Sequence, residues 1–368
     1  MSEALSILYV GDLREGMSCR QRLRALKQLG HEVDSIDIVP PSERNRFLST
    51  WSRITFKLYR MRLLTSFKAI DFAGANEAIL NHIRNVPVDV IWIDSGRTIR
   101  AQTLQEVKKA CPHCIILGYT GDDMMARHNQ SSQFLEGLPL YDVFFTTKTF
   151  GVAELRALGC PRVHFTPFGF DPDAHFPISV SADEKKTIGG EVGFIGFYEE
   201  ERARSMQFLA SHGISVRIYG DGWKSQRVNE CLRVEGRTVF GQDYVRTLCA
   251  FDINLGFLRR MSRDRQTCRS YEIPACGAFM LAERTDEHLE LFKEGVEAEF
   301  FSSDQELLDK VRYYLAHPEE RARIAAAGRN RCLENRYSYP DRVRAILETV
   351  KGECGVDAAH KLAPLAER

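Results

Sequence analysis

The residues best suited to chemistry lie in one arginine-rich segment, residues 263–278. Three arginines, among them Arg265 and Arg269, surround Thr267 and precede a short expected helix. Guanidinium groups beside the free N–H groups of a helix N-terminus are suited to binding a diphosphate. Glu272 lies inside the expected helix, where its carboxylate can accept hydrogen bonds from a ribose diol. We interpret the segment as a nucleotide-binding site, and the alternative is a charged loop in contact with water.

A glycine-containing turn follows the strand expected at 215–219. Such a turn exposes backbone N–H groups, which can bind a phosphate or a base. An ordinary β-turn fits the same residues equally well. The turn consists of Gly220, Asp221, Gly222, Trp223 and Lys224.

Two neighbouring carboxylates, Asp122 and Asp123, follow the strand expected at 114–119. Ligands of open α/β sheets bind outside the carboxyl ends of the strands. A carboxylate at such a strand end can orient an acceptor hydroxyl group or take its proton. The alternative is the N-cap of a helix, a position that aspartate also favours.

Other familiar motifs are absent or misplaced. Gly11 and Gly16 do not have the spacing of a dinucleotide fingerprint, and no Walker phosphate loop occurs, which argues against an NAD-linked oxidoreductase and a P-loop NTPase. The C-x-x-C run from Cys111 to Cys114 follows an expected helix, whereas a redox-active pair opens one. No second pair has zinc-ligand spacing. We interpret the two cysteines as structural.

Short apolar runs alternate with helical patterns in both halves of the chain, which predicts two α/β units. The polar, turn-rich stretch 171–190 is the expected boundary between them. Strands are expected at 5–10, 33–39, 89–93, 114–119, 142–146, 163–166, 192–196, 215–219, 252–256, 277–282 and 298–301. Helices are expected at 20–29, 100–110, 150–158, 200–211, 244–250, 270–276, 304–316 and within 318–347.

A long insertion, residues 41–85, separates the second strand from the third. Its basic and aromatic part, Trp51–Phe67, predicts one or two amphipathic helices. We expect these helices to cover the N-terminal sheet. Contact with a membrane surface or with an anionic, lipid-linked acceptor is an alternative that we do not predict.

The composition limits the function classes further. The 368 residues contain 50 Lys plus Arg and 50 Asp plus Glu, and zero net charge argues against a nucleic-acid partner. The ten cysteines are scattered, without a secretory leader, and predict reduced thiols. No apolar run approaches the length of a membrane span. We expect a cytoplasmic protein; the alternative is a peripheral position on the inner membrane face.

Several segments of the sequence resemble GT-B glycosyltransferases. Residues Ala25–Val33 resemble the end of the first helix of that fold, and Pro167–Asp171 followed by Phe176–Pro177 resembles its inter-domain hinge. Glu272–Gly277 resembles the donor-binding helix of the retaining group, related to the group-1 enzymes. In that helix, a glutamate five residues before a glycine holds the nucleotide ribose.

The chain more closely resembles the CgeB-like, or spore-maturation-protein-like, glycosyltransferases. This resemblance covers most of residues 192–347. It rests on Phe194–Gly196 with Arg202, Tyr219–Trp223, Arg269–Gly277, Leu291–Gly295 and Tyr313–Gly328.

The resemblance implies an α/β protein of the GT-B fold, with two Rossmann-like domains that face a central cleft. The N-terminal, acceptor-side domain is expected at 1–172, with helices from about 336 to 368 packed back onto it. The donor-binding domain is expected at 190–335. The implied activity is hexosyl transfer from a nucleotide-diphosphate sugar, with a UDP-sugar favoured, to a saccharide, lipid-linked or protein acceptor. Retention of configuration and independence of metal and other cofactors are implied as well. The alternatives are a non-catalytic nucleotide-sugar-binding protein and a GT-B epimerase or hydrolase.

Site residues follow from the motifs and the resemblance together. Two departures from the retaining group affect the donor sugar and leave the stereochemistry open: Arg265 stands where that group has a second glutamate, and Asp122 stands near the place of its histidine. The expected catalytic residues are Asp122, Asp123 and Arg269. The expected donor-binding residues are Gly16, Arg202, Gly220, Trp223, Lys224, Arg265, Thr267 and Glu272, and no metal ligand is expected.

Overall fold

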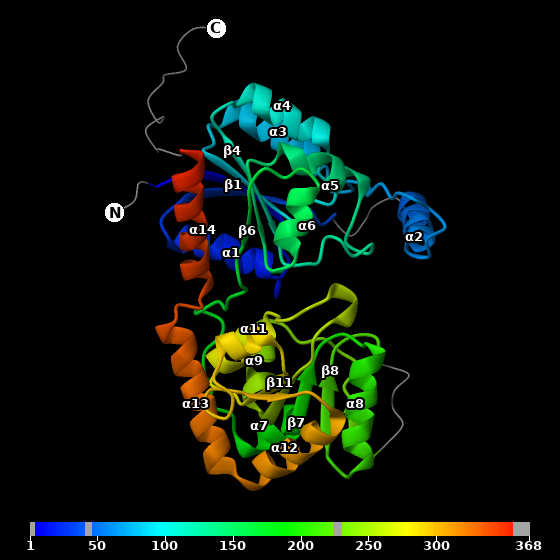
Figure 1. The fold of residues 1–368 in the computed structure, drawn as a ribbon, viewed down its shortest axis with the longest axis vertical. Coiled ribbons are helices and arrows are strands. Elements are labelled where there is room, and N and C mark those ends of the chain that lie inside the picture. The colour runs from blue at the N-terminus through cyan, green and yellow to red at the C-terminus, as the bar shows by residue number, and fades with distance from the viewer. Residues whose placement is uncertain (1–3, 41–45, 224–229, 356–368) are drawn as a thin grey trace. The chain divides into compact units, whose positions relative to one another are not determined.

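The computed structural model describes residues 4–40, 46–223 and 230–355 of the chain, with the backbone alone for 46–49. It divides into two compact units (Figure 1). Unit 1 comprises Met1–Pro167 and Pro340–Arg368, and unit 2 comprises Phe168–Tyr339. The division therefore falls just before the stretch 171–190, which the sequence indicated as the boundary.

Unit 1 is built on a parallel sheet with the strand order β2-β1-β3-β4-β5-β6. Its central strands are buried along their whole length, which explains why they read as continuous apolar runs in the sequence. The strands are β1 Ser6–Gly11, β2 Glu32–Asp37, β3 Val90–Asp94, β4 Ile115–Thr120, β5 Val143–Thr146 and β6 Val163–Phe165. The helices are α1 Ser18–Gln28, α2 Arg46–Arg60, α3 Ala75–Asn85, α4 Ala101–Ala110, α5 Ser132–Gly137, the 3-10 turn η1 Leu138–Leu140, α6 Gly151–Ala157 and α14 Tyr339–Cys354. Only the first residue of α14, Tyr339, belongs to unit 2.

Unit 2 repeats the architecture with the strand order β12-β11-β10-β7-β8-β9, again parallel. The strands are β7 Gly190–Ile195, β8 Val216–Tyr219, β9 Leu232–Val234, β10 Phe251–Gly256, β11 Met280–Glu283 and β12 Glu299–Phe301. The helices are α7 Ala182–Ile188, α8 Glu200–Ser211, α9 Gly241–Cys249, the 3-10 turn η2 Arg260–Ser262, α10 Arg269–Ala275, α11 Asp286–Leu291, α12 Asp304–Ala316 and α13 Pro318–Glu334.

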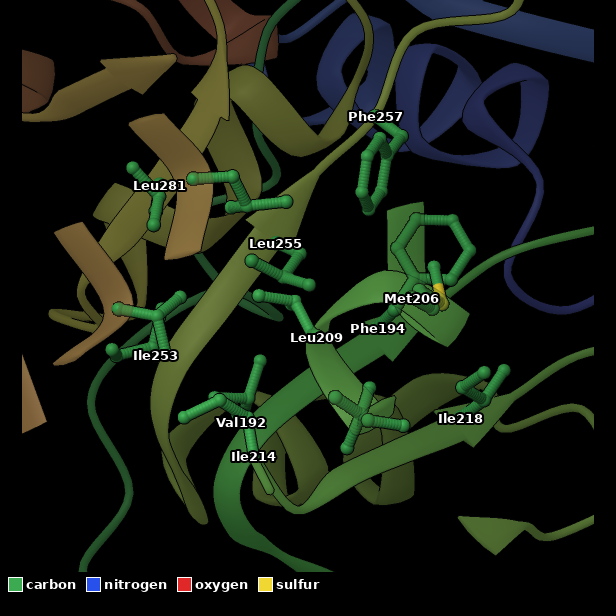
Figure 2. Close-up of a cluster of buried hydrophobic side chains, with 14 of the residues drawn as sticks. Val192, Phe194, Met206, Leu209, Ile214, Ile218, Ile253, Leu255, Phe257 and Leu281 are labelled. Atoms are coloured by element: carbon green, nitrogen blue, oxygen red, sulfur yellow. The ribbon is translucent and has the colours of Figure 1, made fainter. Parts of the chain in front are cut away.

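The core of unit 2 follows the alternation of the strands. Val192 and Phe194 of β7 lie on the same face as Met206 and Leu209 of α8 (Figure 2). Ile195 faces the other way and joins a second apolar cluster on the opposite side of the sheet. Because successive strand residues point to opposite faces, one sheet packs helices on both sides. The strand ends are thereby held in fixed positions.

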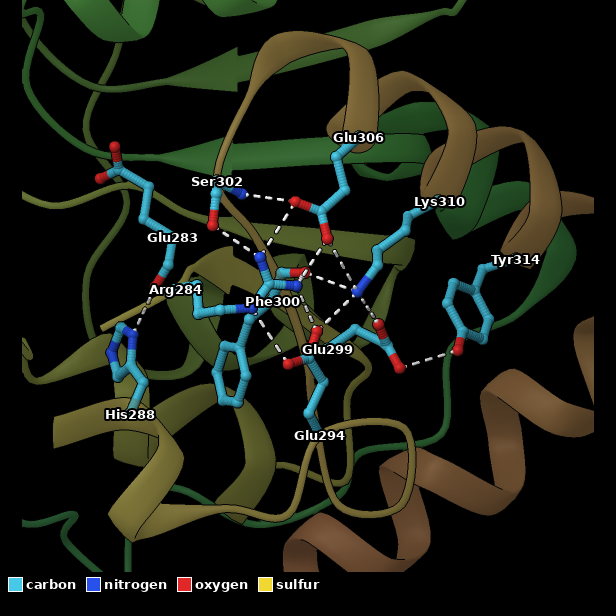
Figure 3. A network of polar contacts seen from close by, with 10 residues as sticks. All are labelled: Glu283, Arg284, His288, Glu294, Glu299, Phe300, Ser302, Glu306, Lys310 and Tyr314. Carbon is cyan, nitrogen blue, oxygen red and sulfur yellow. Dashed lines mark hydrogen bonds and ion pairs between the residues drawn. The ribbon is translucent and has the colours of Figure 1, made fainter. Parts of the chain in front are cut away.

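An ion-pair network holds the edge strand β12 (Figure 3). The Arg284 side chain after β11 donates from Nε to Glu294 Oε2 at 3.0 Å and from Nη1 to Glu306 Oε2 at 3.0 Å. Lys310 of α12 donates to the Phe300 carbonyl oxygen of β12 at 2.6 Å. The hydrogen bond from Arg284 lowers the pKa of Glu306 to about 2. These contacts join β11, β12 and α12.

The structure corrects two expectations about local structure. The polar stretch 171–190 belongs to unit 2 and contains α7. Its N-terminus is a capping box, in which Ser181 Oγ accepts from the Glu184 N–H at 3.2 Å and Glu184 Oε2 accepts from the Ser181 N–H at 2.9 Å. The helical cover on the N-terminal sheet was expected from Trp51–Phe67, but α2 leaves Trp51 57% exposed. Helix α3, which follows that stretch, buries Ile79 instead.

Candidate functional site

Four arginines of unit 2 lie near the carboxyl ends of its parallel strands. Arg202 is in the first turn of α8, Arg259 and Arg260 follow β10, and Arg269 begins α10. Two glutamates lie among them. Glu199 is 3.8 Å from Arg202 and 3.4 Å from Arg259, and Glu283 is 3.9 Å from Arg260. Glu272, one turn after Arg269 on α10, is a third carboxylate, so four positive charges face three negative charges and the remaining positive charge suits a bound diphosphate.

Arg202 is the most deeply buried member of this arginine cluster. Arg202 is only 5% exposed, and it donates from Nη1 to the Phe197 carbonyl oxygen at 3.0 Å. Burial lowers the pKa of Arg202 to about 10; Glu199 opposes this shift, and the charges of Arg269 and Arg259 add to it. Among the residues that the structure describes, the buried Nε atoms of Arg202 and Arg269 have no hydrogen-bond partner. A bound anion would stabilise the charged form of Arg202 and would accept hydrogen bonds from the two Nε atoms.

Glu272 is held in place from two directions. Tyr244 of α9 donates its hydroxyl hydrogen to Glu272 Oε2 at 2.6 Å. His175 Nε2 is 3.8 Å from Glu272 Oε1, and its Nδ1 accepts from the Asp171 N–H at 3.0 Å, so Nε2 carries the ring hydrogen. Burial and the charge of Glu272 raise the pKa of Tyr244, which keeps the phenol a donor. Nothing in the sequence indicated Tyr244 or His175.

The segment before α10 is fixed by a chain of hydrogen bonds. The Thr267 N–H donates to Ser270 Oγ at 3.1 Å, and Ser270 Oγ lies 2.8 Å from His288 Nε2. His288 Nδ1 lies 2.7 Å from the Glu283 carbonyl oxygen (Figure 3). Because that oxygen only accepts, Nδ1 donates to it and Nε2 accepts from Ser270. Burial lowers the pKa of His288 and favours this neutral form. The network therefore orients the start of α10.

Two further residues of this segment, the expected Arg265 and its neighbour Gln266, have different environments. Arg265 is exposed, and its carbonyl oxygen accepts from Thr285 Oγ at 2.7 Å. Gln266 is buried and donates to Glu287 Oε2 at 2.8 Å. Helix α10 is only seven residues long. The arginine side chains, more than the helix dipole expected from the sequence, therefore supply the positive charge.

The glycine turn after β8 serves packing. Gly220 has φ +135°, and a Cβ at this residue would lie 2.1 Å from the Gly196 carbonyl oxygen. That carbonyl oxygen accepts from Trp223 Nε1 at 2.8 Å. The Trp223 ring is 1% exposed and packs edge-on against Phe194 and Tyr198. The structure thus places the Trp223 side chain in the core rather than on a surface that a ligand reaches. Lys224 lies outside the described residues.

The carboxylates of unit 1 lie beyond the end of β4. Asp123 is 2% exposed, and its Oδ1 accepts from the Met125 N–H at 3.0 Å. No helix begins at this point in the described structure, so the N-cap alternative is wrong. Asp122 is half-buried and lines a small pocket together with Lys148. Gly16, with φ +80°, lies in the exposed loop between β1 and α1.

The C-x-x-C cysteines lie between α4 and β4, as expected from the sequence. Cys111 and Cys114 are both buried, at 6% and 4% exposure. A hydrogen bond with Cys114 lowers the pKa of Cys111. Cys111 is the C-cap of α4, so no helix N-terminus faces the pair.

We expect Tyr244→Phe to weaken donor binding. The substitution removes the hydrogen bond that orients Glu272, so KM for a nucleotide-sugar donor should rise about three- to tenfold while kcat changes less. Steady-state kinetics measure the effect. Tyr313→Phe is the matched control because Tyr313 also donates to a glutamate, Glu320, at 2.8 Å, on the exposed surface. Equal effects of both variants would contradict a role for Tyr244.

Comparisons with known proteins agree with this architecture. Residues 202–348 match the family described as glycosyl transferase-like. No curated protein sequence matches the chain. Solved structures with similar folds include Anabaena HepE in complex with UDP, at 12% identity and a TM-score of 0.59, over 95% of this chain and 100% of HepE. A glycosyltransferase from Rickettsia africae aligns at 13% identity and a TM-score of 0.63, over 96% and 100% of the two chains.

A third similar structure is sucrose-phosphate synthase from Thermosynechococcus elongatus, at 11% identity and a TM-score of 0.64, over 94% of this chain and 98% of that one. At such low identity these likenesses establish the fold alone. The protein therefore has the GT-B fold, with two units of six-stranded parallel sheets among the described residues.

Proposed function

We propose that the protein transfers a sugar from a nucleotide-diphosphate sugar to an acceptor. The surplus of positive charge around Arg202 and Arg269 is the observation that carries this proposal. The glycosyl transferase-like match over 202–348 supports it, and so do similar structures that contain UDP and UDP-glucose. On the motifs of 192–347 we also propose the CgeB-like group.

On the donor side, the cluster acts on the diphosphate. Arg269 and Arg202 bind the phosphate oxygens and stabilise the charge that develops as the nucleoside diphosphate leaves. Fixed cations placed there take over the role of a divalent metal ion, so we propose a metal-independent reaction. Glu272, oriented by Tyr244 and His175, binds the ribose hydroxyl groups.

On the acceptor side, Asp122 is the better candidate of the two carboxylates. Asp123 is almost fully buried and accepts the Met125 N–H, so it shapes the loop. Asp122 is half-buried, and it can orient an acceptor hydroxyl group or take its proton. Retention of configuration is proposed from the resemblance of Glu272–Gly277 to the retaining group.

The proposal is tested by a donor screen followed by product analysis. UDP-, GDP-, TDP- and CMP-sugars are added in the presence of EDTA, and the melting temperature is measured, since a ligand of the native state raises it. The best donor is then incubated with candidate saccharide and lipid-linked acceptors. We expect a UDP-sugar to stabilise the protein and to be consumed with EDTA present. Binding of a donor with no turnover would indicate a binding protein, and activity that requires added manganese would overturn metal independence.

We expect Asp122→Asn to reduce turnover without weakening donor binding. Loss of a positioned base costs about a hundredfold in kcat. Turnover is measured with the donor found above, and donor affinity is measured by calorimetry. Glu136→Gln, an exposed carboxylate on α5, is the control. An unchanged kcat in Asp122→Asn would remove the acceptor-side role.

A further inference from the structure

Helix α2 and the turn after it carry an exposed apolar surface. Of the fifteen large hydrophobic side chains that are exposed among the described residues, five lie within residues 51–64. Trp51, Ile54 and Met61 are 57%, 48% and 59% exposed. They are spaced by three and seven residues, and so lie on one side of the helix. Leu63 and Leu64 extend this surface past its end.

Basic residues flank the apolar side chains. Arg53, Lys57 and Arg60 are exposed on α2, and Arg62 and Lys68 are exposed just after it. Between residues 46 and 70 the sequence contains six Lys and Arg and no Asp or Glu. The chain as a whole is neutral, so this positive charge is a local feature. We call residues 51–68 with these side chains the α2 patch.

The side of α2 that carries Tyr59 packs against the rest of unit 1. The Tyr59 ring is 4% exposed and stacks on Phe67 at 5.9 Å. The Arg127 guanidinium lies 3.9 Å from the Tyr59 ring centroid, and its Nη2 donates to the carbonyl oxygens of Tyr59 at 2.8 Å and Leu64 at 2.7 Å. Because these contacts use Tyr59, the helix presents its other sides outward while staying attached.

The end of α2 presents the two leucines beside the helix. Arg62 has φ +62°, and its N–H donates to the Tyr59 carbonyl oxygen at 3.0 Å. The Leu63 N–H donates to the Leu58 carbonyl oxygen at 3.0 Å. These two bonds form a Schellman cap, which reverses the chain. Leu63, two residues after Met61, is 65% exposed and continues the apolar surface past the end of the helix.

We propose that the α2 patch binds the surface of a bilayer that contains anionic lipids. Exposed Trp, Ile, Met and Leu side chains enter the headgroup–acyl boundary, while the flanking Lys and Arg side chains bind lipid phosphates. The combination of apolar side chains, cations and no carboxylate favours an anionic bilayer over a protein partner or a second copy. Within the described residues, no helix is long and apolar enough to span a membrane. The proposed contact is therefore at the surface, and it does not depend on the proposed activity.

Vesicle binding of the full-length protein tests this proposal. Vesicles of phosphatidylcholine alone, and of phosphatidylcholine with phosphatidylglycerol, are sedimented with the protein at low and high salt. We expect at least tenfold stronger binding to the anionic vesicles and weaker binding at high salt. Trp51 also reports insertion because the chain has three tryptophans and the other two, Trp92 and Trp223, are buried. A blue shift of its emission is expected with anionic vesicles and should disappear in Trp51→Phe.

Two double variants separate the apolar contribution to vesicle binding from the electrostatic one. Trp51→Ser/Leu63→Ser and Lys57→Gln/Arg60→Gln should each lower the vesicle partition constant by about tenfold or more. Lys186→Gln/Arg204→Gln, which replaces two exposed side chains of unit 2, is the control for loss of charge. Leu333→Ser, which replaces an exposed leucine of unit 2, is the control for loss of an apolar side chain. Unchanged melting temperatures establish that the variants fold.

Three results would overturn the proposal. The first is equal, salt-independent binding to both kinds of vesicle. The second is binding that the α2 variants retain in full. The third is a wild-type dimer that Trp51→Ser/Leu63→Ser converts to a monomer while neither binds vesicles, which would make the patch a contact between two copies of the chain.

Discussion

Arg269→Ala is expected to weaken UDP binding by at least tenfold and to lower kcat/KM by about a hundredfold to a thousandfold. A charge-assisted hydrogen bond to a phosphate is worth more than a neutral one, and in the proposed reaction the same charge would stabilise the leaving diphosphate in the transition state. Arg202→Ala should have a similar effect because its buried Nε is also unpartnered among the described residues. The loss should appear in kcat as well as in KM.

Calorimetry with UDP and with UMP isolates the diphosphate contribution. In the wild type we expect UDP to bind more tightly than UMP, and in Arg269→Ala we expect this preference to shrink. Arg204→Ala is the matched control. Arg204 lies on α8 two residues after Arg202, its side chain is 64% exposed, and its guanidinium lies 3.8 Å from the Glu201 carboxylate. If Arg269→Ala keeps the full preference for UDP, the diphosphate assignment is wrong.

Asp94→Asn is expected to destabilise the protein by about 3–5 kcal/mol, the cost of breaking a buried ion pair from one side. Asp94 ends β3, and Arg22 of α1 reaches its Oδ2 at 2.6 Å, with both side chains 2% exposed. Tyr9 of β1 donates to the same oxygen at 2.6 Å, and Arg22 lies 4.1 Å from the Tyr119 ring centroid. Without the carboxylate, the Arg22 charge would stay buried without its counter-ion.

Urea unfolding, monitored by tryptophan fluorescence, measures this loss in the free energy of unfolding. Asp12→Asn is the control because Asp12 pairs with Arg14 at the surface at 2.6 Å, where an ion pair contributes less than about 1 kcal/mol. The double variant Arg22→Met/Asp94→Leu should recover much of the stability, since it removes both buried charges together. A loss in Asp94→Asn no larger than that in Asp12→Asn would contradict the account of this pair.

The sequence predicted the architecture because parallel strands buried on both faces leave continuous apolar runs. The runs at 89–93 and 142–146 became β3 and β5 with small shifts at their ends. The strand Leu232–Val234 was missed because its exposed central residue, Arg233, interrupts the apolar run. Helix α7 could have been predicted, since Ser181 and Glu184 have the spacing of a capping box.

The candidate site could be predicted only in part. Arg269 and Glu272 lie within four residues of each other, so one segment indicates both. Tyr244 lies 28 residues before Glu272, and only the packing of α9 against the sheet brings them together. Trp223 was expected among the donor-binding residues because it belongs to the glycine turn after β8, but its indole fills the core. The amphipathic pattern of α2 was visible in the sequence, yet the pattern does not say whether a neighbour covers the apolar side.

Hydrogen exchange of the wild-type protein with and without UDP tests the central claim most directly. The claim is that unit 2 binds the nucleotide diphosphate between the start of α8 and the start of α10. We predict that UDP slows amide exchange in residues 197–202 and 266–272 and that Arg269→Ala removes this protection. Unchanged exchange in both segments, with saturating UDP present, would contradict the account.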